Sequence, residues 1–250
     1  TAKQGLEIHA RIQCKGFLEV DPIIGNVLVD MYAEYGCLHE AHEAFDKLPV
    51  KNVVSWTSLI AGYSEHRHGE EALKCFLEMK CNGILPDAVT YTCILKACAS
   101  IGVIGKGIDI HDAISSKEGF LVKDQDVMLG NALVDMYTKC SGPRTAQEVF
   151  DQLRFRDVVS WNALITGYVH QGMFRETLLC FDRMRSEGLG PDPVTCICIL
   201  KACSSTGAID MGRQIHGEVT SRGLLEKDIS LGNALVDMYA KCGMLEKAQE

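Results

Sequence analysis

Two short fragments of the chain match half of a zinc-enzyme pattern. The triplets at 68–70 and 216–218 both read HGE, and H-x-E supplies one metal ligand and a general acid/base in zinc deaminases. The other half, P-C-x-x-C, would provide two thiolate ligands, but no two of the twelve cysteines have that spacing. The glycines between 102 and 107 do not form G-x-G-x-x-G, and no strand is predicted before them. We therefore expect no catalytic constellation, no metal site and no cofactor.

The cysteines and histidines follow a repeat instead. Cys98 and Cys203 end the same phrase, ILKAC, which predicts small apolar residues of a recurring helix in a reducing compartment. His9, His111 and His216 each follow an isoleucine, and they are 102 and 105 residues apart. A hydrogen bond between helices is a better interpretation of these histidines than a metal ligand.

Composition narrows the class of protein. Hydrophobic residues make up 47% and charged residues 23% of the chain, as in ordinary packed domains. No run of eighteen apolar residues exists, so we expect no membrane span and no membrane partner. The net charge of −8 argues against a protein that holds nucleic acid by bulk electrostatics, because such domains are usually strongly basic.

An eight-residue phrase appears three times and sets the period. It reads GNVLVDMY at 25–32 and GNALVDMY at 130–137 and 232–239, with its asparagines 105 and 102 residues apart. Between these phrases, three types of unit follow one another, which we label S, P and L. Their ranges are 1–21 (partial L), 22–52 (S), 53–87 (P), 88–126 (L), 127–157 (S), 158–192 (P), 193–228 (L) and 229–250 (partial S).

Each unit shows the apolar spacing of two helices. In unit 158–192, Trp161, Leu164, Ile165 and Tyr168 share one helical face, and Phe174, Leu178, Phe181 and Met184 predict a second stripe after Gly172. Unit 22–52 does the same with Leu28, Val29 and Tyr32, then Ala41, Ala44 and Phe45. One pair of helices cannot bury its apolar face alone, so neighbouring pairs must stack. The pattern predicts an all-α solenoid.

These units resemble those of plant PLS-class pentatricopeptide repeat proteins. The P-L-S order and the phrases VVSWNALITGY, ILKAC and GNALVDMY carry the resemblance over the whole chain. It implies a right-handed superhelix of helix-turn-helix repeats that binds single-stranded RNA, one base per repeat. It also implies that the chain is the target-recognition part of an RNA-editing factor that converts cytidine to uridine in a mitochondrion or chloroplast. Other RNA-editing factors are then expected as partners. Because the last unit stops within a predicted helix, we expect a segment of a longer array, which a deaminase domain can follow.

The resemblance assigns base recognition to the fifth and the last residue of each unit. The pairs are Asn26 with Asn52, Thr57 with Asp87, Thr92 with Asp126, Asn131 with Asp157, Asn162 with Asp192, and Ile197 with Asp228, whereas Asn233 has no partner within the sequence. The second residue of each unit is expected to flank the base. These residues are Ile23, Val54, Val89, Met128, Val159 and Val194, and Ser230 departs from their apolar pattern.

The hydrogen-bonding capacity of each pair predicts which base it binds. A carboxylate only accepts, so a last-position Asp favours the N–H of uracil or guanine, whereas Asn52 can donate and favours cytosine or adenine. A fifth-position Asn reaches a small pyrimidine, and Thr leaves room for a purine. The predicted core, from 5′ to 3′, is Y-G-N-U-U-N-Y. The L units are left open, because Ile197 cannot hydrogen-bond a base.

A structural interpretation competes at each of these positions. Asp21, Asn52, Asp87, Asp157, Asp192 and Asp228 precede predicted helices, where Asp and Asn are favoured N-caps, and a capping residue at that edge can also contact a base. Trp56 and Trp161 have the position of stacking platforms, but they also lie in apolar stripes, which favours the core.

Three functions remain at the level of the sequence. A sequence-specific RNA-binding array leads, either as an editing factor or as an organellar RNA processing or stability factor. A protein-binding scaffold of the tetratricopeptide kind is the alternative, although that family keeps a uniform 34-residue period. A complete RNA-modifying enzyme would need a metal site, which this sequence does not contain.

Overall fold

The fold is built from helices throughout the part of the chain that the structure describes. The computed structural model describes residues 22–116, 126–140 and 142–249. The helices are α3 (Pro22–Glu34), α4 (Leu38–Asp46), α5 (Val53–Glu65), α6 (Gly69–Cys81), α7 (Ala88–Ile101), α8 (Ile104–Ser115), α9 (Asp126–Cys140), α10 (Pro143–Gln152), α11 (Val158–His170), α12 (Phe174–Ser186), α13 (Pro193–Thr206), α14 (Ile209–Ser221), α15 (Ile229–Lys241) and α16 (Leu245–Gln249). The all-helical prediction is confirmed.

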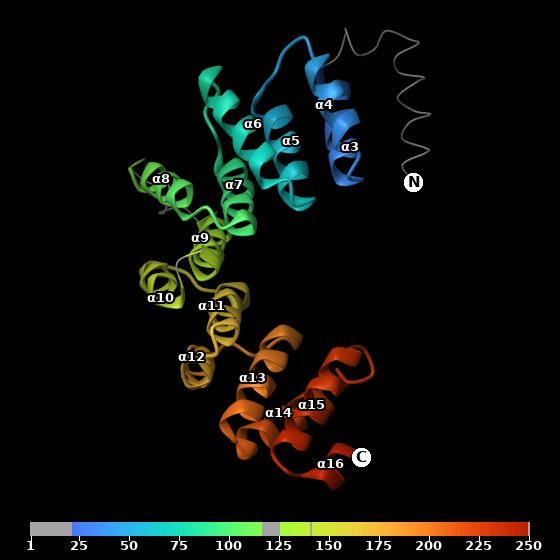
Figure 1. The fold of residues 1–250 in the computed structure, drawn as a ribbon, viewed down its shortest axis with the longest axis vertical. Coiled ribbons are helices and arrows are strands. Elements are labelled where there is room, and N and C mark those ends of the chain that lie inside the picture. The colour runs from blue at the N-terminus through green and yellow to red at the C-terminus, as the bar shows by residue number, and fades with distance from the viewer. Residues whose placement is uncertain (1–21, 117–125, 141, 250) are drawn as a thin grey trace. The chain divides into compact units, whose positions relative to one another are not determined.

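Successive helices form pairs, and the pairs stack. The chain divides into two compact units, 1–136 and 137–250, which we describe separately. In the first unit α3, α5 and α7 pack in series, and α4 and α6 each pack against two of them; in the second, α11, α13 and α15 form the corresponding row (Figure 1). Within each of these two rows, the first helix of one pair therefore contacts the first helix of the next, and side chains at equivalent positions recur along the row.

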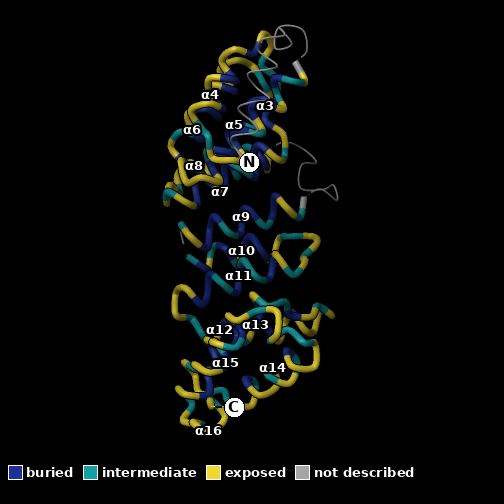
Figure 2. Tube along the Cα trace, turned by 90° about the vertical axis from the view of Figure 1, so that its right-hand side faces the viewer, coloured by how far each residue is buried: buried dark blue, intermediate teal, exposed yellow. Residues whose placement is uncertain are grey.

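The core lies along the predicted apolar faces. Trp161, Leu164 and Ile165 of α11 are fully buried, and Figure 2 shows burial following the helices while the turns stay exposed. The stripe predicted for α12 is only half right. Its buried residues are Thr177, Cys180, Phe181 and Met184, whereas Phe174 and Leu178 are half-buried, because the face that packs is rotated toward the small residues between them.

The two tryptophans are core residues rather than stacking platforms. Trp56 and Trp161 are 2% and 0% exposed. Their rings lie edge-on against the phenylalanine of the preceding pair, with centroid distances of 4.5 Å to Phe45 and 4.6 Å to Phe150. This repeated contact joins the second helix of one pair to the first helix of the next. The core interpretation is confirmed.

A glycine lets neighbouring first helices approach closely in the P units. A Cβ added at Gly62 of α5 would lie 2.6 Å from Ala33 Cβ of α3. The equivalent atom at Gly167 of α11 would lie 2.5 Å from Thr138 Cγ2 of α9. Both distances are shorter than real Cβ contacts, so the phrase GY of the P units fixes how tightly the row of first helices is packed.

The turn within each pair uses a left-handed residue. Gly172 joins α11 to α12 with φ of 71°, a conformation that glycine adopts without steric cost. The corresponding turn between α5 and α6 uses Arg67 with φ of 64°. No helix of the described residues is long and apolar enough to cross a membrane.

Candidate nucleic-acid interface

One exposed apolar side chain projects from near the start of each of six first helices. These residues are the ones that were predicted to flank a base. Their exposed fractions are 69% for Ile23, 55% for Val54, 47% for Val89, 54% for Met128, 57% for Val159 and 50% for Val194. Ser230 is exposed as well. An apolar side chain that is about half exposed or more at the same place of successive repeats favours a ligand surface there.

In five units, the last residue caps the helix that follows. The Oδ1 atoms of Asp87, Asp157 and Asp192 accept backbone N–H groups three residues on, at 2.8 Å in each case. Asn52 accepts from Ser55 N at 3.0 Å, and Asp228 accepts from Ser230 N at 2.8 Å. The capping interpretation is confirmed for these five residues, while Asp21 lies outside the described residues.

Capping also decides what the rest of each side chain offers. A cap requires an acceptor, so Asn52 turns its oxygen toward α5 and leaves its two N–H donors on the other side. An aspartate in the same place uses one oxygen as the cap and keeps a second acceptor. The same position therefore presents a donor in unit 22–52 and an acceptor in units 53–87 and 158–192, because the helix N-terminus uses the first oxygen in both.

In unit 158–192 the two predicted base-reading residues touch each other. Asn162 Nδ2 donates to Asp192 Oδ2 at 2.8 Å. Thr195, the third residue of the next unit, donates from Oγ1 to Asn162 Oδ1 at 2.6 Å and also lies 2.9 Å from Asp192 Oδ1. The network joins α11, α13 and the turn before α13. It fixes the amide so that a nitrogen, not the oxygen, faces the carboxylate.

In unit 53–87 the same two positions are joined through a hydroxyl. Thr57 Oγ1 lies 2.6 Å from Thr90 Oγ1, and Thr90 Oγ1 donates to Asp87 Oδ1 at 2.7 Å. Thr90 holds the place that Thr195 has in the other P unit. Thr57 is half-buried and Asp87 is exposed, so the pair can be reached from solvent.

The S units show a looser arrangement. Asn26 is half-buried, and its Oδ1 atom is buried without a hydrogen-bond partner among the described residues. The neighbouring hydroxyl of Ser55 donates to Asn52 O at 2.9 Å instead. Asn131 and Asp157 belong to different compact units, so each is described only by itself. Asn131 is half-buried, and Asn233 is exposed.

The L units differ most from the sequence expectation. Thr92 is 3% exposed, and its hydroxyl donates to Ala88 O of its own helix at 2.9 Å. Its predicted partner Asp126 is the first residue of α9, and its side chain lies outside the described residues. Ile197 is half-buried, and Asp228 caps α15. In unit 193–228 the apolar Ile197 cannot form a polar pair with Asp228, and in unit 88–126 the hydroxyl of Thr92 is used within its own helix.

Sequence reasoning overlooked Thr90 and Thr195. The signal was present, because the third residue is Ser or Thr in the P and L units (Ser55, Thr90, Ser160, Thr195) but Ile or Leu in the S units (Ile24, Leu129, Leu231). With the preceding Asn or Asp, this is the spacing of a capping box. Capping boxes are formed at Asn52, Asp157 and Asp192. The contact with the fifth residue of the previous unit is what the spacing alone does not reveal.

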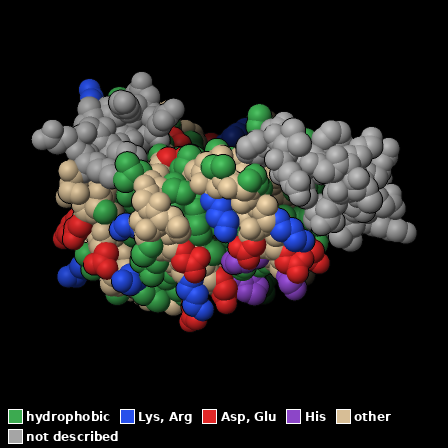
Figure 3. Space-filling model, turned by 90° about the horizontal axis from the view of Figure 1, so that it is seen from above, with side chains coloured by type: hydrophobic (Ala, Val, Ile, Leu, Met, Phe, Trp, Pro, Cys, Tyr) green, Lys and Arg blue, Asp and Glu red, His purple; other side chains and the backbone are tan. Residues whose placement is uncertain are grey.

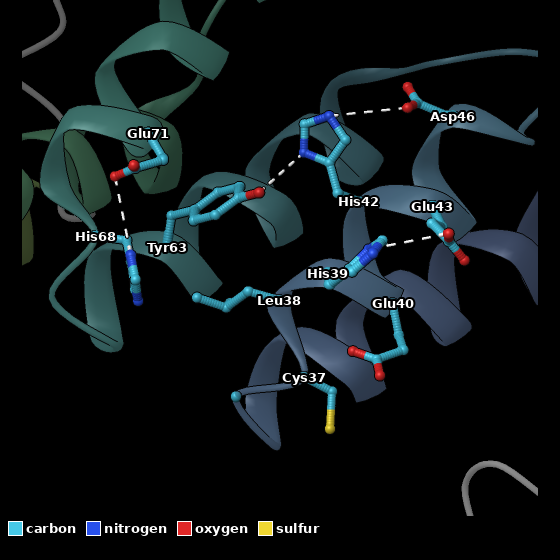
Figure 4. Close-up of a pocket in the computed structure, with 11 residues that line it drawn as sticks. Cys37, Leu38, His39, Glu40, His42, Glu43, Asp46, Tyr63, His68 and Glu71 are labelled. Carbon is cyan, nitrogen blue, oxygen red and sulfur yellow. Dashed lines mark hydrogen bonds and ion pairs between the residues drawn. The ribbon is translucent and has the colours of Figure 1, made fainter.

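A groove of about 700 Å³ lies between α4, α5 and α6. His39, His42 and His68 line it together with acidic residues, and His42 Nδ1 is 2.9 Å from Tyr63 OH (Figure 4). Two other junctions have an equivalent contact. Tyr168 OH donates to Gln147 Oε1 at 3.1 Å, and His216 Nδ1 is 2.9 Å from Tyr239 OH. We interpret His42 as part of this packing contact between helix pairs.

The structure also shows the surroundings of the predicted histidines and of several cysteines. His216 joins α14 to α15 through Tyr239, which confirms a hydrogen-bonded histidine, while His9 lies outside the described residues. Burial lowers the pKa of His111, against a smaller opposite effect of Asp112. Burial raises the pKa of Cys75 and Cys180 to about 12, so these thiols stay protonated and apolar. The described residues contain no group of three or more metal-ligating side chains placed to hold an ion.

Charge is mixed on the face that Figure 3 presents. Acidic and basic side chains alternate there, apart from the atoms drawn in grey, and do not form one continuous basic patch. This agrees with the net charge of −8. The net charge argues against recognition of a polyanion by bulk electrostatics.

Comparison with known proteins defines the class. The fold is an all-helical repeat of helix pairs, like that of PPR10 in complex with an 18-nt psaJ RNA element, with a TM-score of 0.77 and 19% identity over 99% of this chain and 36% of that one. Models described as "PPR repeat family" match residues 51–100 and 156–205, and those of "PPR repeat" match 26–53 and 233–250. The chain belongs to the pentatricopeptide repeat family, of the plant type.

Curated relatives in Arabidopsis thaliana agree with this assignment. The chain is 36% identical over 249 residues to pentatricopeptide repeat-containing protein At4g38010, covering 99% of this chain and 43% of the relative. It is 35% identical over 244 residues to the chloroplastic protein At4g18520, covering 98% of this chain and 39% of the relative. Another relative, At3g13770, is mitochondrial. The chain thus spans less than half the length of these relatives.

Proposed function

We propose that the chain binds single-stranded RNA sequence-specifically, with one base for each repeat that carries a polar pair. The observation that supports this most strongly is the contact between Asn162 and Asp192, at 2.8 Å. It lies between two first helices whose second residues, Val159 and Val194, are half or more exposed. Two apolar side chains separated by one polar pair form a slot that suits a flat base with a hydrogen-bonding edge.

The geometry in unit 158–192 favours uracil. Asp192 offers an acceptor toward N3–H, and Asn162 has a second N–H that can donate to a uracil carbonyl oxygen. Cytosine has a lone pair at N3, which a carboxylate would repel. The two residues already bond to each other, so little side-chain entropy is lost when the base enters.

The geometry in unit 53–87 favours guanine. Asp87 again offers an acceptor, and Thr57 is shorter than asparagine, which leaves space for a purine ring. In unit 22–52 the cap turns the N–H groups of Asn52 outward, so an acceptor at N3 of cytosine fits there. These assignments give the first two letters of the core Y-G-N-U-U-N-Y, and unit 158–192 gives its fifth.

The remaining letters rest on the sequence pattern. We propose uracil for unit 127–157 through Asn131 and Asp157, and a pyrimidine for the unit that begins at Ile229 through Asn233. The L units at 88–126 and 193–228 stay unspecified in the proposal. The buried hydroxyl of Thr92 and the apolar side chain of Ile197 support this choice.

We further propose that this array selects the target of an organellar C-to-U editing factor of the PLS class. The three unit lengths in rotation support the class, and the chloroplastic and mitochondrial relatives support the location. PPR10, which shares the fold, is solved with an RNA element. A role in RNA processing or stability would use the same recognition surface.

Binding to short synthetic RNAs tests the proposal. The chain is titrated at moderate salt with an RNA that carries the core, and with RNAs that have U, C, A or G at its fifth letter. We expect uracil to be preferred, with a wrong base costing about 1–3 kcal/mol, or roughly fivefold to more than a hundredfold in Kd. Equal affinity for the core and a scrambled RNA would reject sequence-specific binding and favour the tetratricopeptide-like, protein-binding alternative.

A further inference from the structure

Both P units place a threonine hydroxyl from the next repeat against their fifth residue. Thr90 contacts Thr57, and Thr195 contacts Asn162, each at 2.6 Å. The two threonines are 0% exposed, so water cannot replace these contacts. They are the third residues of the two L units.

The direction of the hydrogen bonds at Thr90 is fixed by a count of protons. The carboxylate of Asp87 can only accept, so Thr90 must give it the single hydroxyl proton across the 2.7 Å contact. The proton between Thr57 and Thr90 must then come from Thr57. As a result, Thr57 Oγ1 offers only lone pairs to a base. A purine that presents N–H groups there, as guanine does, is favoured over one that presents a ring nitrogen lone pair, as adenine does.

At Thr195 the same hydroxyl holds an amide. Its single proton has two acceptors within reach, Asn162 Oδ1 at 2.6 Å and Asp192 Oδ1 at 2.9 Å. The shorter contact needs this proton, because Asn162 Oδ1, unlike the hydroxyl of Thr57, cannot donate. Asn162 Nδ2 uses one N–H on Asp192. With the oxygen held, the group that Asn162 can still offer is its second N–H. This is a donor, which suits a carbonyl oxygen of uracil and not the exocyclic amine of cytosine.

The serines at the equivalent place in the P units do not make this contact. Ser55 donates to Asn52 O and Ser160 to Asp157 Oδ1, both at 2.9 Å. Ser55 completes a capping box, as Thr195 does, but leaves Asn26 Oδ1 without a partner among the described residues. This makes Ser55 a matched control for capping without the additional contact.

We propose that Thr90 and Thr195 are specificity-determining positioning residues. Each fixes whether the fifth residue of the preceding repeat acts as a donor or an acceptor toward the base. The proposal rests on the proposed function. It gives the L units a part in base selection even though they leave their own base unspecified.

The test measures selectivity ratios rather than affinity alone. Thr195→Val keeps the shape of the side chain and removes the hydroxyl, and we expect the U:C ratio of affinities at the fifth letter to fall about three- to tenfold, the factor that corresponds to one hydrogen bond. Thr90→Val should lower the G:A ratio at the second letter by a similar factor. Ser55→Ala, which removes a capping hydroxyl, should leave the base preference at the first letter unchanged.

The outcomes separate the two proposals. If the unmodified chain shows no base preference at the second and fifth letters, the proposed function fails. If it shows the preferences and both threonine variants keep the ratios, even with weaker overall binding, the positioning role is overturned and base reading stands. A circular dichroism melt of each variant verifies that the array is folded at the binding temperature, and a second pair, Thr90→Ala and Thr195→Ala, replaces any valine variant that does not fold.

Discussion

The two P units hold nearly the same polar cluster and differ at one side chain. In both, an aspartate caps the next helix through Oδ1, and a buried threonine of that helix contacts the fifth residue. The fifth residue is Thr57 in one unit and Asn162 in the other. Thr57 reaches the aspartate only through Thr90, whereas Asn162 reaches it directly. A constant frame with one variable side chain is what a modular code requires.

The junction after unit 22–52 shows what changes when the frame itself changes. Asn52 replaces aspartate, and Ser55 replaces threonine. The cap is retained, but the outward group becomes a donor and the fifth residue loses its contact with the next helix. Capping is thus common to all three junctions, while the hydrogen-bonding character of the exposed edge depends on which residue forms the cap.

The broadest effect, on both stability and base preference, is expected when the shared aspartate is removed. Asp192→Ala deletes the cap of α13 and the partner of Asn162, so we expect a loss of about 1–2 kcal/mol in the free energy of unfolding and loss of the uracil preference. Chemical denaturation and RNA binding measure the two parts. Asp228→Ala is the control, because Asp228 caps α15 but its unit has Ile197 at the fifth position. The division of roles fails if Asp228→Ala changes the base preference as much as Asp192→Ala.

Exchange of the variable side chain should convert one P unit into the other. Asn162→Thr is expected to change the preference at the fifth letter from uracil to guanine, a change of about 1–3 kcal/mol in relative affinity. Thr57→Asn is the reciprocal change and should favour uracil at the second letter. Competition binding with the four RNAs at each letter measures both. A variant that loses uracil without gaining guanine would show that the two frames are not equivalent.

The glycine contacts allow a comparison that concerns stability alone. Gly62→Ala would place a Cβ 3.0 Å from the backbone Cα of Ala33, whereas Gly167→Ala meets only side-chain atoms of Thr138. Overpacking of this kind costs about 1–3 kcal/mol, and we expect Gly62→Ala to be the more destabilising of the two because backbone moves less easily than a side chain. Urea titration of both variants measures the difference. The opposite order would indicate that α3 adjusts more easily than Thr138.

The smallest effect is expected at the turn within the first P unit. Arg67 has a left-handed backbone where the second P unit has Gly172. Arg67→Gly relieves steric strain, although a more flexible unfolded chain offsets part of the gain, so we expect a stabilisation of up to about 1 kcal/mol. Differential scanning calorimetry detects the rise in Tm, while Gly172→Ala should lower it. A fall in Tm for Arg67→Gly would mean that the arginine side chain makes a compensating contact.

Most of the fold follows from spacing along the chain. Apolar residues at helical intervals predict the buried faces of Trp161, Leu28 and Phe45, because a helix that repeats every few dozen residues must stack on its neighbours. The prediction weakens where the apolar pattern is ambiguous. In α12, Phe174 and Phe181 are both large and apolar, but only Phe181 is fully buried, and the choice depends on the angle at which α12 meets its neighbours.

The candidate site was only partly predictable for a related reason. The sequence treats Thr92 and Thr57 alike, as threonines at the fifth position. In the structure the hydroxyl of Thr92 turns back to Ala88 O, whereas that of Thr57 meets Thr90. A hydroxyl has one proton and several acceptors within reach, so its partner depends on distances between helices that no local pattern specifies.

The amino-acid sequence by itself determined the period, the helix pairs, most of the apolar faces and the caps. The period is read directly from the repeated phrases, and the other features depend on residues within a few turns of one another. Tertiary structure decided which polar groups meet across neighbouring repeats. Thr195 lies 33 residues from Asn162 in the chain, yet their side chains are in contact. Because the packing distance between α11 and α13 sets that contact, the donor and acceptor pattern at the exposed edge is a property of two repeats together.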